Sequence, residues 1–111
     1  MYHNPRCSKS RQTLALLEEN GQQPEIILYL NTPPSAIELS DILNKLGISA
    51  RQLLRKGEDA YKEHKLADTT LSDADLIEAM IHHPKLIERP IVVKGKKAIL
   101  GRPPENVLTL L

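Results

Sequence analysis

The stretch YHNPRCSKSRQTLALLEENG, residues 2–21, opens the fold and holds the only cysteine of the chain. Residues 1–3 can end a strand, and Asn4-Pro5 is a turn signal. The residues that follow predict a helix, because Leu14 and Leu17 fall on one helical face and Gly21 is a typical stop. Cys7 is therefore expected just before the first turn of a helix.

The middle of the chain is expected to be helical. Three capping boxes, in which a serine is followed three residues later by a polar acceptor side chain, predict helix starts after Ser35, Ser49 and Ser72. The second of these helices is short and is expected to end near residues 55–57. The polar stretch 58–70 predicts irregular or weakly helical structure without core residues.

Two further segments supply the rest of the sheet. EIILYL, residues 25–30, is a short apolar run of the kind found in buried strands. Residues 90–100 are apolar on either side of a Gly-containing turn, which predicts a β-hairpin. PPENVLTLL, residues 103–111, predicts a short helix. The order β-α-β, helices, β-β-α predicts an α/β fold with a helical insertion between its two halves.

Length, composition and charge limit the kinds of protein this can be. A chain of 111 residues, with 41% hydrophobic and 26% charged, predicts a single domain over residues 1–111. Its three aromatic residues are all Tyr and its net charge is +1, so neither nucleic-acid binding nor attraction to a membrane surface is expected. No apolar run approaches the roughly 20 residues of a membrane span.

The surroundings of Cys7 predict a reactive thiol. Backbone N–H groups at a helix start and the cations Arg6, Lys9 and Arg11 all favour a thiolate, and such settings lower the cysteine pKa from about 8.5 to between about 3.5 and 7.5. A buried structural cysteine is the alternative, but NPRCSKS has no apolar residue beside Cys7. A lone cysteine makes no internal disulfide, which predicts a reducing compartment, the cytoplasm.

The same loop is suited to an oxyanion. Its backbone N–H groups and the side chains of Ser8, Ser10 and Arg11 can all donate to anionic oxygens. The Cys-x5-Arg spacing of phosphatase loops is absent, and the position three after Cys7 is Ser10, so a Cys-x-x-Cys redox site is absent as well.

At this point the sequence resembles a known family. YHNPRCSKSR is similar to the active-site segment of the glutaredoxin-dependent arsenate reductases, and the likeness continues through IILYL, LLRKGEDAY, RPIVV and GRPPE. The resemblance implies a thioredoxin-like fold, a mixed β-sheet flanked by helices, with a cis-proline at Arg89-Pro90. It further implies that arsenate is the substrate, that glutathione and glutaredoxin are partners, and that no cofactor or metal is bound.

The resemblance also implies roles for individual residues. Cys7 would be the nucleophile, and three arginines would hold the arsenic oxyanion and its adduct: Arg55, Arg89 and Arg102. His3 matches the histidine just before the loop, and its role, like that of Ser10 and Arg11, is expected to be auxiliary.

Other interpretations of the sequence stay open. The thioredoxin-like superfamily includes redox regulators that bind RNA polymerase, although the missing second cysteine and the retained arginines speak against that role here. A thiol oxidoreductase acting on another oxyanion or on glutathione adducts is a third reading. Arg6 and Arg51 are interpreted as solvated surface charges. His82 and His83 are adjacent and make a poor metal pair.

Overall fold

The computed structural model describes all residues 1–111, and the chain forms two compact units. The first, called the sheet unit here, comprises Met1–Thr32 and Arg89–Leu111. The second, the helical unit, comprises Pro33–Glu88 and corresponds to the insertion expected between the two halves of the sheet. No helix of the chain is both long and apolar enough to cross a bilayer.

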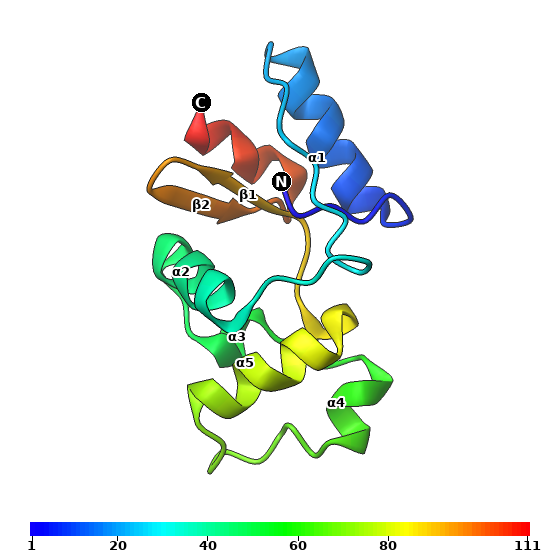
Figure 1. Ribbon diagram of the computed structural model, residues 1–111. Coiled ribbons are helices and arrows are strands. Elements are labelled where there is room, and N and C mark those ends of the chain that lie inside the picture. Colours follow the sequence, from blue (N-terminus) through cyan, green and yellow to red (C-terminus); the bar gives the residue numbers. More distant parts are fainter. The chain divides into compact units, whose positions relative to one another are not determined.

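The sheet unit contains the predicted hairpin (Figure 1). Strands β1 (Ile91–Lys94) and β2 (Lys97–Leu100) pair antiparallel, with Ile91 opposite Leu100. Gly95, at the turn between them, has a φ of +61°, a left-handed value that residues with a Cβ adopt at a cost. The glycine therefore allows the tight connection that sets this register.

The first residues of the chain pair with strand β1 of this hairpin and lie between it and the segment around Ile27. Tyr2 bridges antiparallel to Ile91 on one side and parallel to Ile27 on the other. These are isolated bridges rather than full strands, and the prediction of a buried strand at 25–30 is wrong. Ile26 and Leu28 are each 40% exposed, because this segment pairs with the sheet only through Tyr2 and alternates its side chains between two sides.

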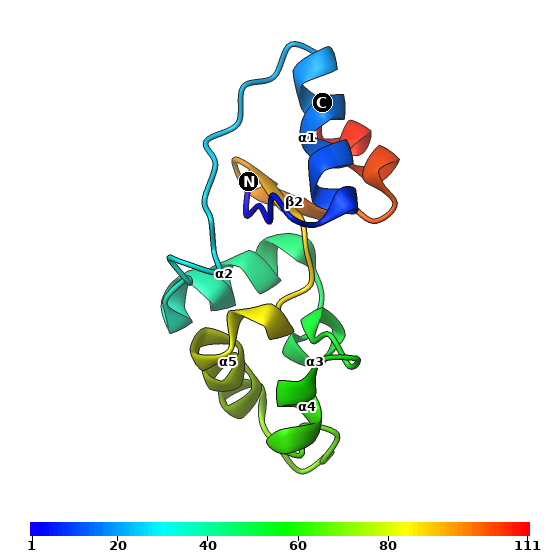
Figure 2. The same cartoon turned by 90° about the vertical axis from the view of Figure 1, so that its right-hand side faces the viewer.

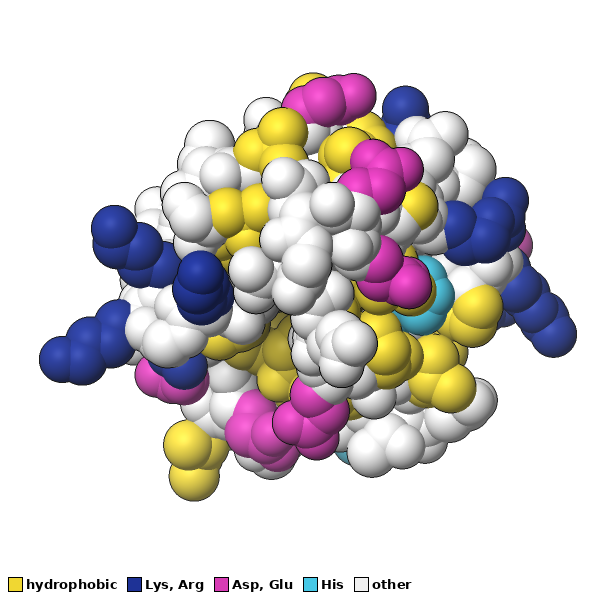
Figure 3. All heavy atoms as spheres, turned by 90° about the horizontal axis from the view of Figure 1, so that it is seen from above, with side chains coloured by type: hydrophobic (Ala, Val, Ile, Leu, Met, Phe, Trp, Pro, Cys, Tyr) yellow, Lys and Arg dark blue, Asp and Glu magenta, His cyan; other side chains and the backbone are white.

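Two helical elements cover the hairpin in the sheet unit. Helix α1 (Ser8–Glu19) packs against η2 (Pro104–Leu110), a 3₁₀ helix where an α-helix was expected, and η2 also contacts β2 (Figures 1 and 2). Their shared core is formed by Met1, Leu17, Val92 and Val107. On the face drawn in Figure 3, acidic side chains (magenta) lie among hydrophobic ones (yellow) near the centre.

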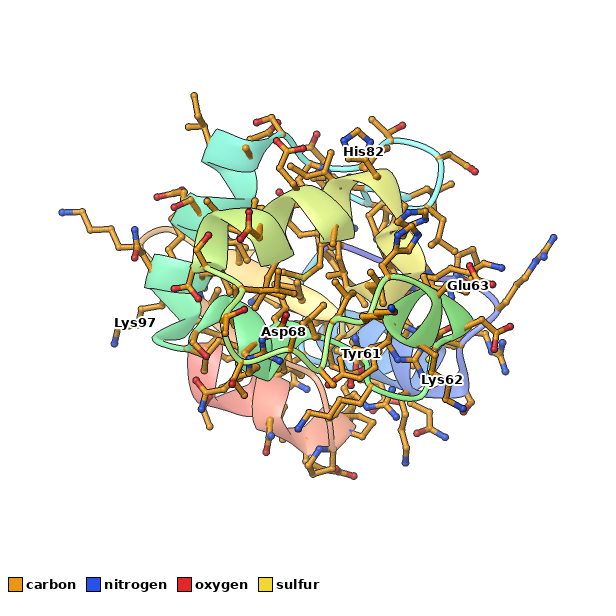
Figure 4. The ribbon with its side chains drawn as sticks, turned by 90° about the horizontal axis from the view of Figure 1, so that it is seen from below. Tyr61, Lys62, Glu63, Asp68, His82 and Lys97 are labelled. Atoms are coloured by element: carbon orange, nitrogen blue, oxygen red, sulfur yellow. The ribbon has the colours of Figure 1, made fainter.

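The helical unit begins its helices where the capping boxes predicted. The side chains of Ser35, Ser49 and Ser72 each accept a hydrogen bond from the backbone N–H of the residue three positions on, and the side chain of that residue accepts a hydrogen bond from the serine N–H. The unit consists of α2 (Ala36–Leu46), α3 (Ala50–Leu53), α4 (Asp59–Glu63), α5 (Asp73–His82) and the 3₁₀ turn η1 (Pro84–Leu86). Figure 4 shows Lys62 and Glu63 of α4 and His82 of α5 pointing outward.

One buried residue of the helical unit was not expected from the sequence. Leu66, in the polar stretch 58–70, is only 4% exposed, so the prediction that this stretch contributes no core residue is wrong. Arg51 holds this polar loop in place, because its guanidinium donates to the carbonyl oxygens of Leu66 and Asp68, each at 2.9 Å. Arg51 is therefore a structural residue and not the solvated charge that was predicted.

Candidate functional site

The loop before α1 is a tight turn that delivers Cys7 to the start of the helix. The Cys7 N–H donates to the carbonyl oxygen of Asn4 at 3.0 Å, and the Arg6 N–H donates to Asn4 Oδ1 at 3.1 Å. Asn-Pro sequences favour such turns because the asparagine side chain can bond to its own backbone two residues on. Cys7 is the N-cap residue of α1, in an extended conformation, and its side chain is half-buried.

A buried pair holds this loop from beneath. His3 Nδ1 lies 2.7 Å from Ser10 Oγ, and the same oxygen accepts from the Asn4 N–H at 3.1 Å. Ser10 is fully buried, so its hydroxyl hydrogen needs an acceptor, and a neutral His3 Nδ1 supplies one. The Ser10 hydroxyl is thus occupied inside the loop. Arg11 lies outside it and donates to the carbonyl oxygen of Pro5 at 2.9 Å.

The electrostatics of the loop favour the thiolate form of Cys7 and the neutral form of His3. Burial, followed by the charges of the N-terminal amino group and Arg11, lowers the pKa of His3. For Cys7 the largest single effect is partial burial, which raises the pKa of the thiol. Hydrogen bonds from the Ser10 N–H, the Arg89 side chain and the Lys9 N–H, with the Arg89 charge, outweigh it and lower the pKa of Cys7 overall.

Two of the three predicted arginines lie beside Cys7. Arg102 Nη1 is 3.9 Å from Cys7 Sγ and 3.3 Å from the carbonyl oxygen of Arg89, to which it donates. The Arg89-Pro90 bond is cis, as predicted, and the Arg102-Pro103 bond is cis as well. The structure therefore groups the Cys7 thiolate with Arg89 and Arg102, although the sequence separates them widely.

The third arginine, Arg55, belongs to the helical unit. Its backbone N–H donates to the carbonyl oxygen of Leu86 at 2.8 Å, directly after the buried residue Leu54. Its Nη1 lies 3.0 Å from Glu58 Oε1, and its Nε lies 3.5 Å from Glu88 Oε1. Its role in holding an anion stays a prediction, and the guanidinium has further N–H groups for that purpose.

Sequence reasoning missed a contact that supports this site. Thr13 is fully buried on α1, and its hydroxyl lies 2.8 Å from the Lys9 carbonyl oxygen and 3.2 Å from that of Gly101. Gly101 comes directly before Arg102, so this contact joins the helix that begins at Cys7 to the segment that carries Arg102. The glycine in GRPPE was the available signal, because a conformationally permissive residue often marks a close approach of two segments.

This arrangement can perform nucleophilic chemistry on an oxyanion. A thiolate is a strong nucleophile, and planar guanidinium groups bind tetrahedral anions through paired N–H donors. No group of three or more His, Cys, Asp or Glu side chains is placed to hold a metal ion. The residues at hand therefore fit anion binding and covalent attack by sulfur.

Comparison with known proteins gives matches over the whole chain. Residues 2–110 match the model of the ArsC family. The chain is 60% identical to the uncharacterized protein YfgD of Escherichia coli K12 over 112 residues, covering 100% of this chain and 94% of that protein. It is 54% identical to a Haemophilus influenzae protein named arsenate reductase, with 100% of this chain and 97% of that protein covered.

Solved structures confirm the predicted fold. The arsenate reductase from Vibrio cholerae matches with a TM-score of 0.97 and 55% identity, covering 99% of this chain and 94% of that one. A putative arsenate reductase from Yersinia pestis matches with a TM-score of 0.93 and 57% identity, covering 97% and 96%. The thioredoxin-like α/β fold expected from the sequence is therefore the fold of this chain.

Proposed function

Because this chain belongs to the ArsC family, we propose that it reduces arsenate to arsenite through a covalent adduct on Cys7. The observation that carries the proposal is the 3.9 Å separation between Arg102 Nη1 and the sulfur of a cysteine whose pKa is lowered. A nucleophile and an anion-binding donor at this distance can engage the same tetrahedral ion.

The first step is the attack of Cys7 on arsenic. The thiolate forms a sulfur–arsenic bond, and one arsenic–oxygen bond breaks. The departing hydroxide takes a proton from solvent and leaves as water. Arg89 and Arg102 bind the remaining oxygens and offset their charge, with Arg55 as the third arginine of the set.

The second step needs a thiol from outside the chain. Reducing arsenate takes two electrons and produces a disulfide, which requires two sulfurs, whereas Cys7 is the only cysteine here. Glutathione supplies the second. Its thiolate attacks the Cys7 sulfur, the sulfur–arsenic bond breaks with its electron pair left on arsenic, and arsenite departs. A disulfide between Cys7 and glutathione remains.

The third step regenerates the thiolate. A glutaredoxin thiolate attacks the glutathione sulfur of the mixed disulfide, takes up the glutathione and releases Cys7. No bound cofactor takes part. This chemistry suits a reducing compartment such as the cytoplasm, where glutathione keeps thiols reduced.

The test is turnover of arsenate with purified components. With glutathione and glutaredoxin we expect multiple turnover, and without glutaredoxin we expect mass spectrometry to show one glutathione on Cys7. Cys7→Ser is the matched control and should show neither arsenite nor an adduct. Multiple turnover by the wild type in the absence of any added thiol would contradict the mechanism, because the chain has no second sulfur able to form a disulfide.

A further inference from the structure

A cavity of about 300 Å³ lies against the Cys7 loop in the sheet unit. One wall is formed by the residues just before Cys7, and the other by the segment that follows Ile27; the lining residues are His3, Asn4, Pro5, Arg6, Leu28, Leu30 and Asn31. Its volume is at the lower end of the range of about 300–1,000 Å³ typical of small-molecule sites. None of the roles assigned above to Cys7, Arg89 or Arg102 uses this cavity.

Two largely buried side chains of the lining, Asn4 and His3, offer N–H groups at the cavity. Asn4 is 8% exposed, and since its Oδ1 accepts from the Arg6 N–H, its Nδ2 donors remain. His3 is 6% exposed, and in the tautomer that gives the buried Ser10 hydroxyl an acceptor at Nδ1, the neutral ring carries its hydrogen on Nε2. N–H donors that line a cavity suit a ligand that offers acceptor atoms.

The rest of the lining suggests the kind of acceptor. Arg6 and Asn31 are exposed and add a cation and a further amide at the cavity. Leu28 and Leu30, with the Pro5 ring, provide apolar surface between these polar groups. A lining of donors, one cation and apolar carbon suits an organic carboxylate better than a fully hydrated inorganic anion.

The cavity is also close to the reacting sulfur. Asn4 and Cys7 are the first and last residues of the turn closed by the Cys7 N–H and the Asn4 carbonyl oxygen. The Cα atoms of such residues lie within about 7 Å of each other. A ligand held by Asn4 thus has its neighbouring atoms within reach of Cys7. Arg89 and Arg102 also contact Cys7, but neither of them lines the cavity.

We propose that this cavity binds a carboxylate of the co-substrate thiol, a small peptide thiol of the glutathione type, and directs its sulfur to Cys7. This proposal rests on the proposed function, because only that reaction requires a thiol from outside the chain. Asn4 Nδ2 and the Arg6 guanidinium bind the carboxylate, His3 Nε2 donates to a neighbouring carbonyl oxygen, and Leu28 and Leu30 contact the carbon chain. Separate sets of residues then bind the oxyanion and the thiol beside Cys7.

Binding is tested without any reaction by titrating the protein with S-methylglutathione, which has no free thiol. In NMR spectra we expect shifts of the side-chain amide signals of Asn4 and Asn31. Asn4→Asp keeps the acceptor for the Arg6 N–H but replaces the Nδ2 donors by an oxygen anion, and we expect binding at least about tenfold weaker. Arg6→Ala should weaken binding similarly, whereas Lys96→Ala, which removes a cation from the hairpin turn, should bind as the wild type does.

A kinetic ratio provides the second test. Asn4→Asp also changes the charge near Cys7, so we compare kcat/KM for glutathione with that for 2-mercaptoethanol, which has no carboxylate, in each variant. This ratio should fall at least about tenfold in Asn4→Asp and Arg6→Ala, and stay at the wild-type value in Lys96→Ala. An unchanged ratio in both cavity variants would overturn the proposal, as would S-methylglutathione shifts that spare Asn4 and Asn31.

The outcomes separate this proposal from the proposed function. S-methylglutathione binding at Asn4 and Asn31 without any arsenate turnover would support the cavity as a peptide-thiol site and reject arsenate as substrate. Arsenate turnover with an unchanged thiol ratio would support the proposed function and reject the cavity. Competition between arsenate and S-methylglutathione for the Asn4 signal would also count against the cavity proposal, since it assigns the two ligands to different residues.

Discussion

The Thr13 hydroxyl lies 3.2 Å from the carbonyl oxygen of Gly101, in a contact that leaves no room for a side chain on the glycine. A Cβ at Gly101 would stand 2.6 Å from Thr13 Oγ1, 2.8 Å from Thr13 Cγ2 and 2.9 Å from the Pro90 ring. Neither neighbour can move away easily, because a buried β-branched side chain and a proline ring are both stiff. The contact fixes α1 against the segment that carries Arg102.

Gly101→Ala should therefore destabilise the protein. We expect a loss of about 1–3 kcal/mol in the free energy of unfolding, the usual cost of overpacking a filled interior. Urea denaturation measures it. Gly57→Ala is the matched control, because a Cβ at Gly57 meets no atom within 4 Å. Equal stability of the two alanine variants would show that α1 can shift without cost.

The thiolate of Cys7 should form below the value of a free cysteine, about 8.5. Rates of iodoacetamide alkylation measured against pH give the midpoint. In Arg89→Ala the midpoint should rise, because that change removes both a hydrogen bond and a positive charge that lower the pKa of Cys7. Lys96→Ala serves as the control for loss of a cation in general. A midpoint in Arg89→Ala equal to that of the wild type would contradict the assigned cause.

His3 should make the protein less stable in acid. Burial holds the pKa of His3 below its ordinary value of 6.5, so the unfolded chain takes up the proton first as the pH falls. The contribution of His3 to the free energy of unfolding is thus fully present above the ordinary value and is lost as the pH falls through the folded pKa. His3→Gln should reduce the pH dependence of stability below about pH 6.5. An NMR titration of the His3 ring with a midpoint at or above that value would disprove this.

The three arginines should each support arsenate turnover. Removing Arg55, Arg89 or Arg102 by substitution with Ala should lower kcat/KM about ten- to a hundredfold, the worth of one charged hydrogen bond. Lysine at these positions should restore less than full activity, because it lacks the planar fork of a guanidinium. Circular dichroism checks that each variant is folded. Wild-type turnover in Arg55→Ala would show that its pairing with Glu58 and Glu88 is its whole role.

Arg51→Ala should lower stability rather than chemistry. The change leaves the carbonyl oxygens of Leu66 and Asp68 without the guanidinium that binds them, at an expected cost of about 1.5–3 kcal/mol. Thermal unfolding measures the loss, and Lys56→Ala, an exposed cation nearby in the sequence, is the control. If Arg51→Ala unfolds at the wild-type temperature, the loop that includes Leu66 is held by other contacts.

Local signals in the sequence predicted much of this structure. The capping boxes at Ser35, Ser49 and Ser72 placed helix starts correctly because the bonds that cap a helix are made between neighbours in the sequence. The hairpin was predictable for the same reason. The segment 25–30 was misjudged because its apolar run does not reveal that only Ile27 pairs with the sheet.

Local sequence signals predicted only part of the candidate site. The placement of Cys7 at a helix start follows from the adjacent turn and helix signals, whereas its approach to Arg102 depends on the packing of α1 against a segment far along the chain. Family resemblance predicted Arg89 and Arg102, but the Ser10–His3 bond leaves no pattern in the sequence, and Gly101 alone does not reveal that its partner is Thr13. Both depend on buried groups meeting in three dimensions.

The lowered pKa of Cys7 also bears on how the protein leaves an oxidised state. In thiol–disulfide exchange the sulfur whose thiol has the lower pKa departs more readily. The hydrogen bonds from Ser10, Arg89 and Lys9 that stabilise the thiolate before it attacks therefore stabilise it equally as a leaving group. A disulfide on Cys7 is consequently more oxidising than one formed by a cysteine of ordinary pKa, and its reduction relies on a thiol from outside, because the chain has no second cysteine.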